Sequence, residues 1–238
     1  MDILNYGKEK IEEEVNFYMK NFHLNKNNAF TDRDTEDFIS SIPFTNIKNL
    51  GFNWEVGATK LVIIPTYKPY VVKIPLTGDY VFEEYFPFEN GTSNGSFNYI
   101  EGENNVYDWA RLEGFSKMFL PNYYINSFEG IPVYVQPKCE IYIWQDKEQM
   151  KYASVDSKRK IKQEQVFHQK RYSSLLKLPE EWVASCLDAL GTMEKVYDFI
   201  KFLNYFPVGA DLHNGNIGYY KGQAIILDYG GYREEDFY

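Results

Sequence analysis

The 238-residue sequence predicts an α+β fold. Two apolar, β-branched runs between residues 54 and 76 are separated by Pro-Thr-Tyr-Lys-Pro, which has the composition of a hairpin turn. After Pro179, apolar residues recur every three or four positions, which is the pattern of an amphipathic helix. We therefore expect a sheet in the first half of the chain and helices in the last third.

The composition excludes several classes of function. A net charge of −9, with 34 acidic and 25 basic residues, argues against sequence-independent binding of nucleic acid or of an anionic membrane, since both need excess Lys and Arg. No apolar run approaches a bilayer span, and the N-terminus has no basic start followed by an apolar stretch. Cys139 and Cys186 are too few for a disulfide scaffold or a thiolate zinc site. We expect a soluble protein of the cytoplasm, or of the host cytoplasm if the chain is viral.

Helices are predicted in four places. Residues 7 to 22 have apolar residues at helical spacing, and residues 33 to 42 form a second, shorter candidate. A third helical face runs from Tyr99 to Ala110 despite the cost of Gly102. After Pro179 one long helix is predicted from its apolar positions: Trp182, Cys186, Leu190, Met193, Val196, Ile200 and Leu203.

Further strands are predicted after the first pair. Two short strands flank Glu129-Gly130, and Pro137 is expected to end the second of them. Near the end of the chain, residues 217 to 228 read as strand, Lys221-Gly222 turn and strand.

Three polar residues stand around that last hairpin. Transfer of a phosphoryl group from a nucleotide needs metal ions on the phosphates, an orienting group or base at the incoming hydroxyl, and a cation. Carboxylate and amide oxygens are the ligands that magnesium prefers. Because a hairpin brings its ends together, Asn216 and Asp228 are expected to meet at one ion, while Asp211 faces the substrate.

These residues resemble the catalytic core of the protein kinase-like superfamily. The sequence "DLHNGN" is similar to the catalytic loop D-x-x-x-x-N, in the form found in aminoglycoside phosphotransferases and choline kinases, and "DYG" resembles the metal-binding D-F-G. "YVVKIP" resembles the third-strand V-A-I-K element, which makes Lys73 the phosphate-binding lysine. Its implied ion-pair partner is Glu103, with Glu101 as the alternative.

The resemblance extends over residues 50 to 232 and implies a two-lobed fold. A helical extension would occupy residues 1 to 48, a small antiparallel-sheet N-lobe 49 to 137, and a reduced helical C-lobe 138 to 238. "IPVYVQPK" falls at the strand that leads to the adenine-binding hinge, which implies adenine contacts from the backbone of Gln136 and Lys138. "FEGIPVYVQPK" also resembles small kinase-like proteins of bacteriophages.

The sequence departs from the family pattern at three points. The Gly-rich loop is missing, and only Gly57, together with Gly51, stands where its phosphate-binding turn belongs. Gly209-Ala210 replace the His-Arg before the catalytic Asp, so regulation through a phosphorylated activation segment is not expected. Only eight residues follow Gly230, so we expect no lower helices to carry a peptide substrate.

The implied activity is an ATP- and magnesium-dependent phosphotransferase that moves the γ-phosphoryl group to a hydroxyl of a protein or small molecule. The resemblance makes Lys73 the ligand of the α and β phosphates, and Asn216 and Asp228 the ligands of magnesium. It makes Asp211 the residue that accepts or orients the proton of the attacking hydroxyl. Two alternatives stay open: a pseudokinase that binds or inhibits a partner, and an enzyme that transfers a nucleotidyl group.

Each of these residues also has a purely structural interpretation. Lys73 could be an exposed strand residue and Glu103 a solvated helix residue, while His213 is expected to bond to backbone rather than to a metal. A basic cluster is either a solvated helix face or a docking patch for an acidic partner. It comprises Lys158, Arg159, Lys160, Lys162, Lys170 and Arg171.

Overall fold

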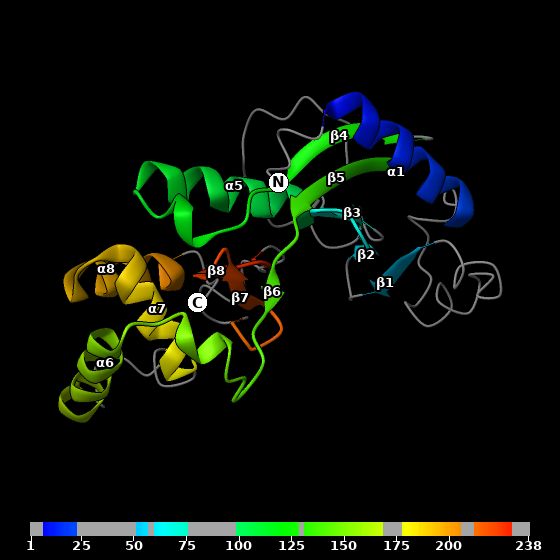
Figure 1. Ribbon diagram of the computed structural model, residues 1–238. Coiled ribbons are helices and arrows are strands. Elements are labelled where there is room, and N and C mark those ends of the chain that lie inside the picture. The colour runs from blue at the N-terminus through cyan, green and yellow to red at the C-terminus, as the bar shows by residue number, and fades with distance from the viewer. Residues whose placement is uncertain are drawn as a thin grey trace. The chain divides into compact units, whose positions relative to one another are not determined.

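The computed structural model describes residues 7–22, 51–56, 60–75, 99–128, 131–168, 178–205 and 212–229. These residues form an α+β structure, as the sequence predicted (Figure 1). They divide into two compact units, of which the first contains the described residues up to Asn104 together with Pro121–Lys138. The second contains Asn105–Leu120 and the described residues from Cys139 onward.

This division differs from the expected boundaries in two ways. The expected helical extension, where it is described, belongs to the first unit, because Ile11 and Val15 share an apolar core with the sheet. Residues 105–120, expected in the N-lobe, belong to the second unit, because Val106 and Phe119 are buried in the helical core. The candidate helix at 33–42 lies outside the described residues.

The first unit is built on a five-stranded antiparallel sheet with the order β1-β2-β3-β5-β4. The predicted hairpin is confirmed, since Ile63 pairs with Val72 across the turn that follows Pro65. The strands on either side of Glu129-Gly130 are also confirmed, and Pro137 ends the second of them. The strands are β1 (Phe52–Val56), β2 (Lys60–Pro65), β3 (Tyr70–Pro75), β4 (Tyr123–Phe128) and β5 (Ile131–Pro137).

The two faces of this sheet differ in chemistry. Side chains alternate along a strand, so Leu61, Ile63, Val72 and Ile74 share one face. They form one core with α1 (Lys8–Phe22), which contacts β4 and lies across β4 and β5 in Figure 1. The other face therefore carries the residues between them, including Lys60 and Lys73.

The second unit is mainly helical. Its smaller sheet has the order β6-β7-β8, and the predicted C-terminal hairpin is confirmed with its turn at Lys221-Gly222, where both residues have positive φ. The elements are the later part of α5 (Tyr99–Leu112), η2 (Ser116–Met118), β6 (Glu140–Ile141), η3 (Gln149–Lys151), α6 (Val155–His168), α7 (Glu180–Leu190), α8 (Met193–Tyr205), β7 (Ile217–Tyr220) and β8 (Gln223–Ile226). None of the helices in the described ranges has the length and apolarity that crossing a bilayer requires.

The prediction of one long helix after Pro179 is wrong, because the chain forms α7 and α8 with a break at Gly191. Gly191 adopts φ 89°, a left-handed conformation, and its N–H donates to the carbonyl of Leu187 at 2.7 Å. This is the usual C-terminal cap of a helix. Thr192 Oγ1 then accepts the N–H of Lys195 at 3.2 Å, which caps the start of α8.

Candidate functional site

A buried carboxylate, Glu103 on α5, is the centre of a charged cluster in the first unit. Its Oε2 lies 2.8 Å from Lys73 Nζ, so the predicted ion pair is present. Lys60 Nζ donates to the other carboxylate oxygen, Oε1. Glu103 is fully buried, and each lysine has an exposed fraction of only 4%. One carboxylate thus binds two buried ammonium groups.

The strand register explains why two lysines reach the same carboxylate. Lys73 pairs with Val62 across the β2–β3 ladder, and Lys60 lies two residues before Val62. Because residues two apart point to the same face, Lys60 and Lys73 are diagonal neighbours on one face of the sheet. The distance between diagonal neighbours is within reach of long side chains.

Asn122 completes the cluster from the segment before β4. Its Nδ2 donates to Glu103 Oε2 at 2.6 Å, so this oxygen accepts from both Asn122 and Lys73. Asn122 Oδ1 is buried and has no hydrogen-bond partner among the residues that the structure describes. A buried acceptor left in this state is costly, so this position is suited to a water or another donor.

Glu101, the alternative partner of Lys73, has a different contact. Its Oε1 accepts the hydroxyl of Tyr134 at 3.1 Å. Glu101 and Glu103 are two positions apart on a helix, so they point in different directions. The structure therefore selects Glu103 for the ion pair.

The two residues expected at the adenine hinge differ in their backbone environment. Gln136 is buried on β5 and pairs with Val71 of β3. The N–H of Lys138 donates to the carbonyl of Pro69 at 2.8 Å, and its Nζ donates to the carbonyl of Pro65 at 3.1 Å. Lys138 is thus bound to the β2–β3 turn, and its N–H is not available to adenine in this conformation.

In the second unit, the β7–β8 hairpin brings two predicted magnesium ligands to its open end. Ile217 pairs with Ile226, and the N–H of Leu227 donates to the carbonyl of Asn216 at 3.0 Å. Asn216 and Asp228 therefore both stand at the open end of the hairpin, and their meeting at one ion stays a prediction. Asn216 is buried and Asp228 is half-buried. Magnesium needs only one or two protein carboxylates when phosphates and water supply its other ligands, so this pair is chemically suited to it.

The prediction that His213 bonds to backbone is confirmed. His213 Nδ1 accepts the N–H of Gly215 at 3.0 Å, and its carbonyl accepts the N–H of Asn216 at 2.9 Å. His213 thus shapes the turn that leads into Asn216. Asp211 and Gly57, two of the predicted site residues, lie outside the described residues. Within the described ranges no three His, Cys, Asp or Glu residues gather as a metal site.

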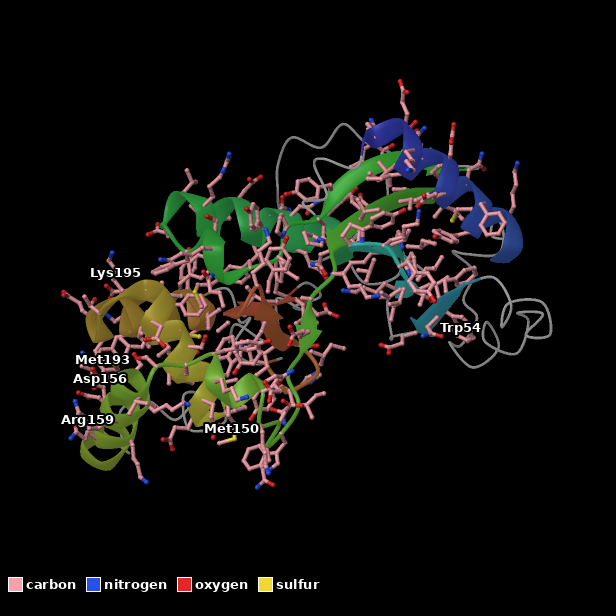
Figure 2. All side chains as sticks on the ribbon, viewed as in Figure 1. Trp54, Met150, Asp156, Arg159, Met193 and Lys195 are labelled. Carbon is pink, nitrogen blue, oxygen red and sulfur yellow. The ribbon has the colours of Figure 1, made fainter. Side chains whose placement is uncertain are left out.

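The basic cluster lies on α6 as far as the structure describes it. Lys160 and Lys162 are exposed, and Arg159 forms a 2.9 Å ion pair with Asp156 on the helix surface (Figure 2). This agrees with a solvated helix face. Lys170 and Arg171 lie outside the described residues.

Sequence reasoning missed Lys60 and Asn122. Lys60 opens the apolar run "KLVIIP", where a lysine reads as the polar end of a strand. Asn122 stands in a connecting segment and belongs to no motif. The only available signal was that Lys60 and Lys73 fall on the same face once the hairpin register is known.

No protein-family model, curated protein or solved structure matches this chain.

Proposed function

We propose that the chain is a kinase-like phosphotransferase with two lobes, which uses Mg·ATP to phosphorylate a hydroxyl of a protein or small molecule. The observation that carries this proposal is the buried ion pair between Lys73 and Glu103 on the polar face of the five-stranded sheet. A buried carboxylate holds the ammonium group in one orientation before any substrate arrives. Such preorganised charge is the main means by which phosphoryl transfer is accelerated.

The stability of the fold alone does not account for this ion pair. Burying two charges costs free energy that their attraction offsets only in part, and apolar replacements are often as stable. Burial of closely placed charges is instead typical of functional sites. The Glu103 cluster is therefore better explained by a role in binding than by a role in folding.

Asn216 and Asp228 supply the second part of the proposed chemistry. In the proposal they bind magnesium, which neutralises charge on the phosphates. The acceptor hydroxyl attacks the γ-phosphorus, the bond from that phosphorus to the β,γ-bridging oxygen breaks, and ADP leaves. The hydroxyl proton passes to the carboxylate of Asp211, a role that rests on the resemblance alone.

The test uses ATP labelled at the γ-phosphate, with magnesium and cell extract. Asp228→Asn should abolish transfer of the label, because it removes the charged metal ligand. Asp211→Asn should retain ATP binding and lose transfer. A matched control is Asp198→Asn, which alters an exposed carboxylate paired with Lys201 on α8 and should leave transfer unchanged. Full transfer by Asp228→Asn would refute the metal assignment.

The second candidate is a pseudokinase that binds or inhibits a partner. It is favoured by the bond between the N–H of Lys138 and Pro69, which removes one expected adenine contact. If the chain binds ATP but transfers label neither to itself nor to any component of the extract, the pseudokinase is selected. Label retained from the α-phosphate instead of the γ-phosphate would select nucleotidyl transfer.

A further inference from the structure

We propose that Lys60 is a second phosphate-binding residue, so that a nucleoside triphosphate is held by two lysines anchored to one carboxylate. This inference rests on the proposed function and deepens it. Its starting observation is that Lys60 and Lys73 donate to different oxygens of the same buried Glu103.

Lys60 brings a second buried ammonium group to Glu103. Lys73 and Glu103 would by themselves form a neutral pair, and a buried ammonium group is costly. Lys60 adds a second one at an exposed fraction of 4%. Within this trio two ammonium groups share one carboxylate, and an anion placed beside them is attracted by both.

The two ammonium groups are held on one face of the sheet. Lys60 and Lys73 come from adjacent strands and point to the same face of the sheet. Glu103 fixes both ammonium groups, one on each oxygen, so neither lysine has to be ordered when a ligand arrives. Two fixed cations side by side are complementary to consecutive phosphates of a polyphosphate chain, and less so to a single carboxylate.

The sequence before β2 lacks a Gly-rich phosphate-binding loop. A Gly-rich loop binds phosphates with backbone N–H groups, and this chain has no such motif before β2. Lys60 is the first residue of β2, next to the place that this loop would occupy in the sequence. A side-chain ammonium at this position supplies the positive charge that a Gly-rich loop supplies through its dipoles. The third donor, Asn122, bonds to Glu103 Oε2 at 2.6 Å and helps to hold the carboxylate oriented toward both lysines.

The experiment measures binding of inorganic triphosphate, ATP and adenosine to the full chain by calorimetry. Lys60→Met should weaken the binding of triphosphate and of ATP by about tenfold or more, since a hydrogen bond to a charged group is lost. Adenosine should bind to it as to the wild type. The matched control is Lys68→Met, which removes a lysine that is bound to Glu14 of α1. It should leave the affinities for triphosphate, ATP and adenosine unchanged.

Lys60→Arg serves as the second variant, because it keeps the charge if Lys60→Met does not fold. It should retain triphosphate binding, and its loss of one lysine signal assigns Lys60 Nζ in the NMR spectrum of the wild type. Addition of triphosphate should shift that signal. An unshifted Lys60 signal, or equal affinity of Lys60→Met and the wild type for triphosphate, would overturn the inference.

The two proposals fail in different ways. If the chain transfers phosphate and Lys60→Met leaves the KM for ATP unchanged, Lys60 is not a phosphate ligand but the phosphotransferase stands. If triphosphate binds in a Lys60-dependent manner and no label is transferred, the anion site stands and the enzyme does not. If neither triphosphate nor ATP binds to the wild type, both are wrong.

Discussion

The two units of this chain place polar groups in their interiors in opposite ways. In the first unit, Lys60, Lys73 and Glu103 are buried and bind one another as full charges. In the second unit, the buried side chains of Trp182 and Tyr229 donate to main-chain carbonyls, of Gly218 at 3.1 Å and of Leu120 at 2.6 Å. Buried neutral side chains therefore donate to main-chain carbonyls in one unit, while buried charged groups bind one another in the other.

This difference separates binding groups from structural ones. A neutral donor on a buried carbonyl satisfies a group that the fold itself has buried, and so contributes to stability. A buried ion pair satisfies charges that the fold had no need to bury. The comparison predicts that the charged cluster can be replaced by apolar residues without loss of the fold, provided that all its members are replaced together.

The largest expected effect comes from breaking the cluster at its centre. Glu103→Gln removes a carboxylate that contacts both Lys60 and Lys73, and this should destabilise the first unit by about 3–5 kcal/mol. Hydrogen exchange measured by mass spectrometry would show faster exchange in β2 and β3 than in the wild type, with α7 unchanged.

Two variants make this prediction decisive. Glu101→Gln keeps an acceptor for the hydroxyl of Tyr134, and should cost no more than about 1 kcal/mol. The combined Lys60→Met, Lys73→Met and Glu103→Leu variant should recover most of the stability that Glu103→Gln loses. If the combined variant is the less stable of the two, the cluster is structural and the comparison between the units collapses.

Local pattern was sufficient to predict much of the first unit. The turn after Pro65, the helical face from Tyr99 onward and the partner of Lys73 all followed from spacing or from ordered motifs. Lys60 and Asn122 could not be predicted, because their partner Glu103 is 43 and 19 positions away and no motif links them. Such contacts depend on strand register and helix placement, which the whole fold determines.

A smaller effect is expected where the second unit uses a charge. Asp188 of α7 accepts the N–H of Ser154 at 2.6 Å and the hydroxyl of Ser157 at 2.6 Å, near the start of α6. Burial by itself raises the pKa of Asp188, but these hydrogen bonds outweigh it and leave the pKa below its ordinary value. Asp188→Ala should cost about 1 kcal/mol at pH 7, through the loss of its hydrogen bonds from Ser154 and Ser157.

The pH dependence of this loss has a definite sign. A carboxyl whose pKa is lowered by folding stabilises the protein above its unfolded pKa of about 3.9, and this contribution disappears as the pH falls through the folded value. The difference in melting temperature between wild type and Asp188→Ala should therefore narrow below about pH 4. A difference that stays constant down to pH 3 would mean that the Asp188 charge does not stabilise the start of α6.

An effect of similar size is expected at the break between α7 and α8, which the apolar periodicity did not reveal. The helical spacing continues through Gly191 because both helices bury the same kind of face, so only the backbone conformation distinguishes one helix from two. In a continuous helix, Gly191→Ala would stabilise the protein by about 1 kcal/mol. At φ 89°, where a Cβ would meet no atom within 4 Å, the cost is purely conformational.

Gly191→Ala should accordingly destabilise the second unit by about 1 kcal/mol. Gly191→Asn should lose less, because asparagine tolerates the left-handed region better than alanine does. The midpoint of urea denaturation, measured for both variants, decides the matter by its sign. A higher urea midpoint for Gly191→Ala than for the wild type would indicate one continuous helix. A midpoint that falls in the order glycine, asparagine, alanine would support the break at Gly191.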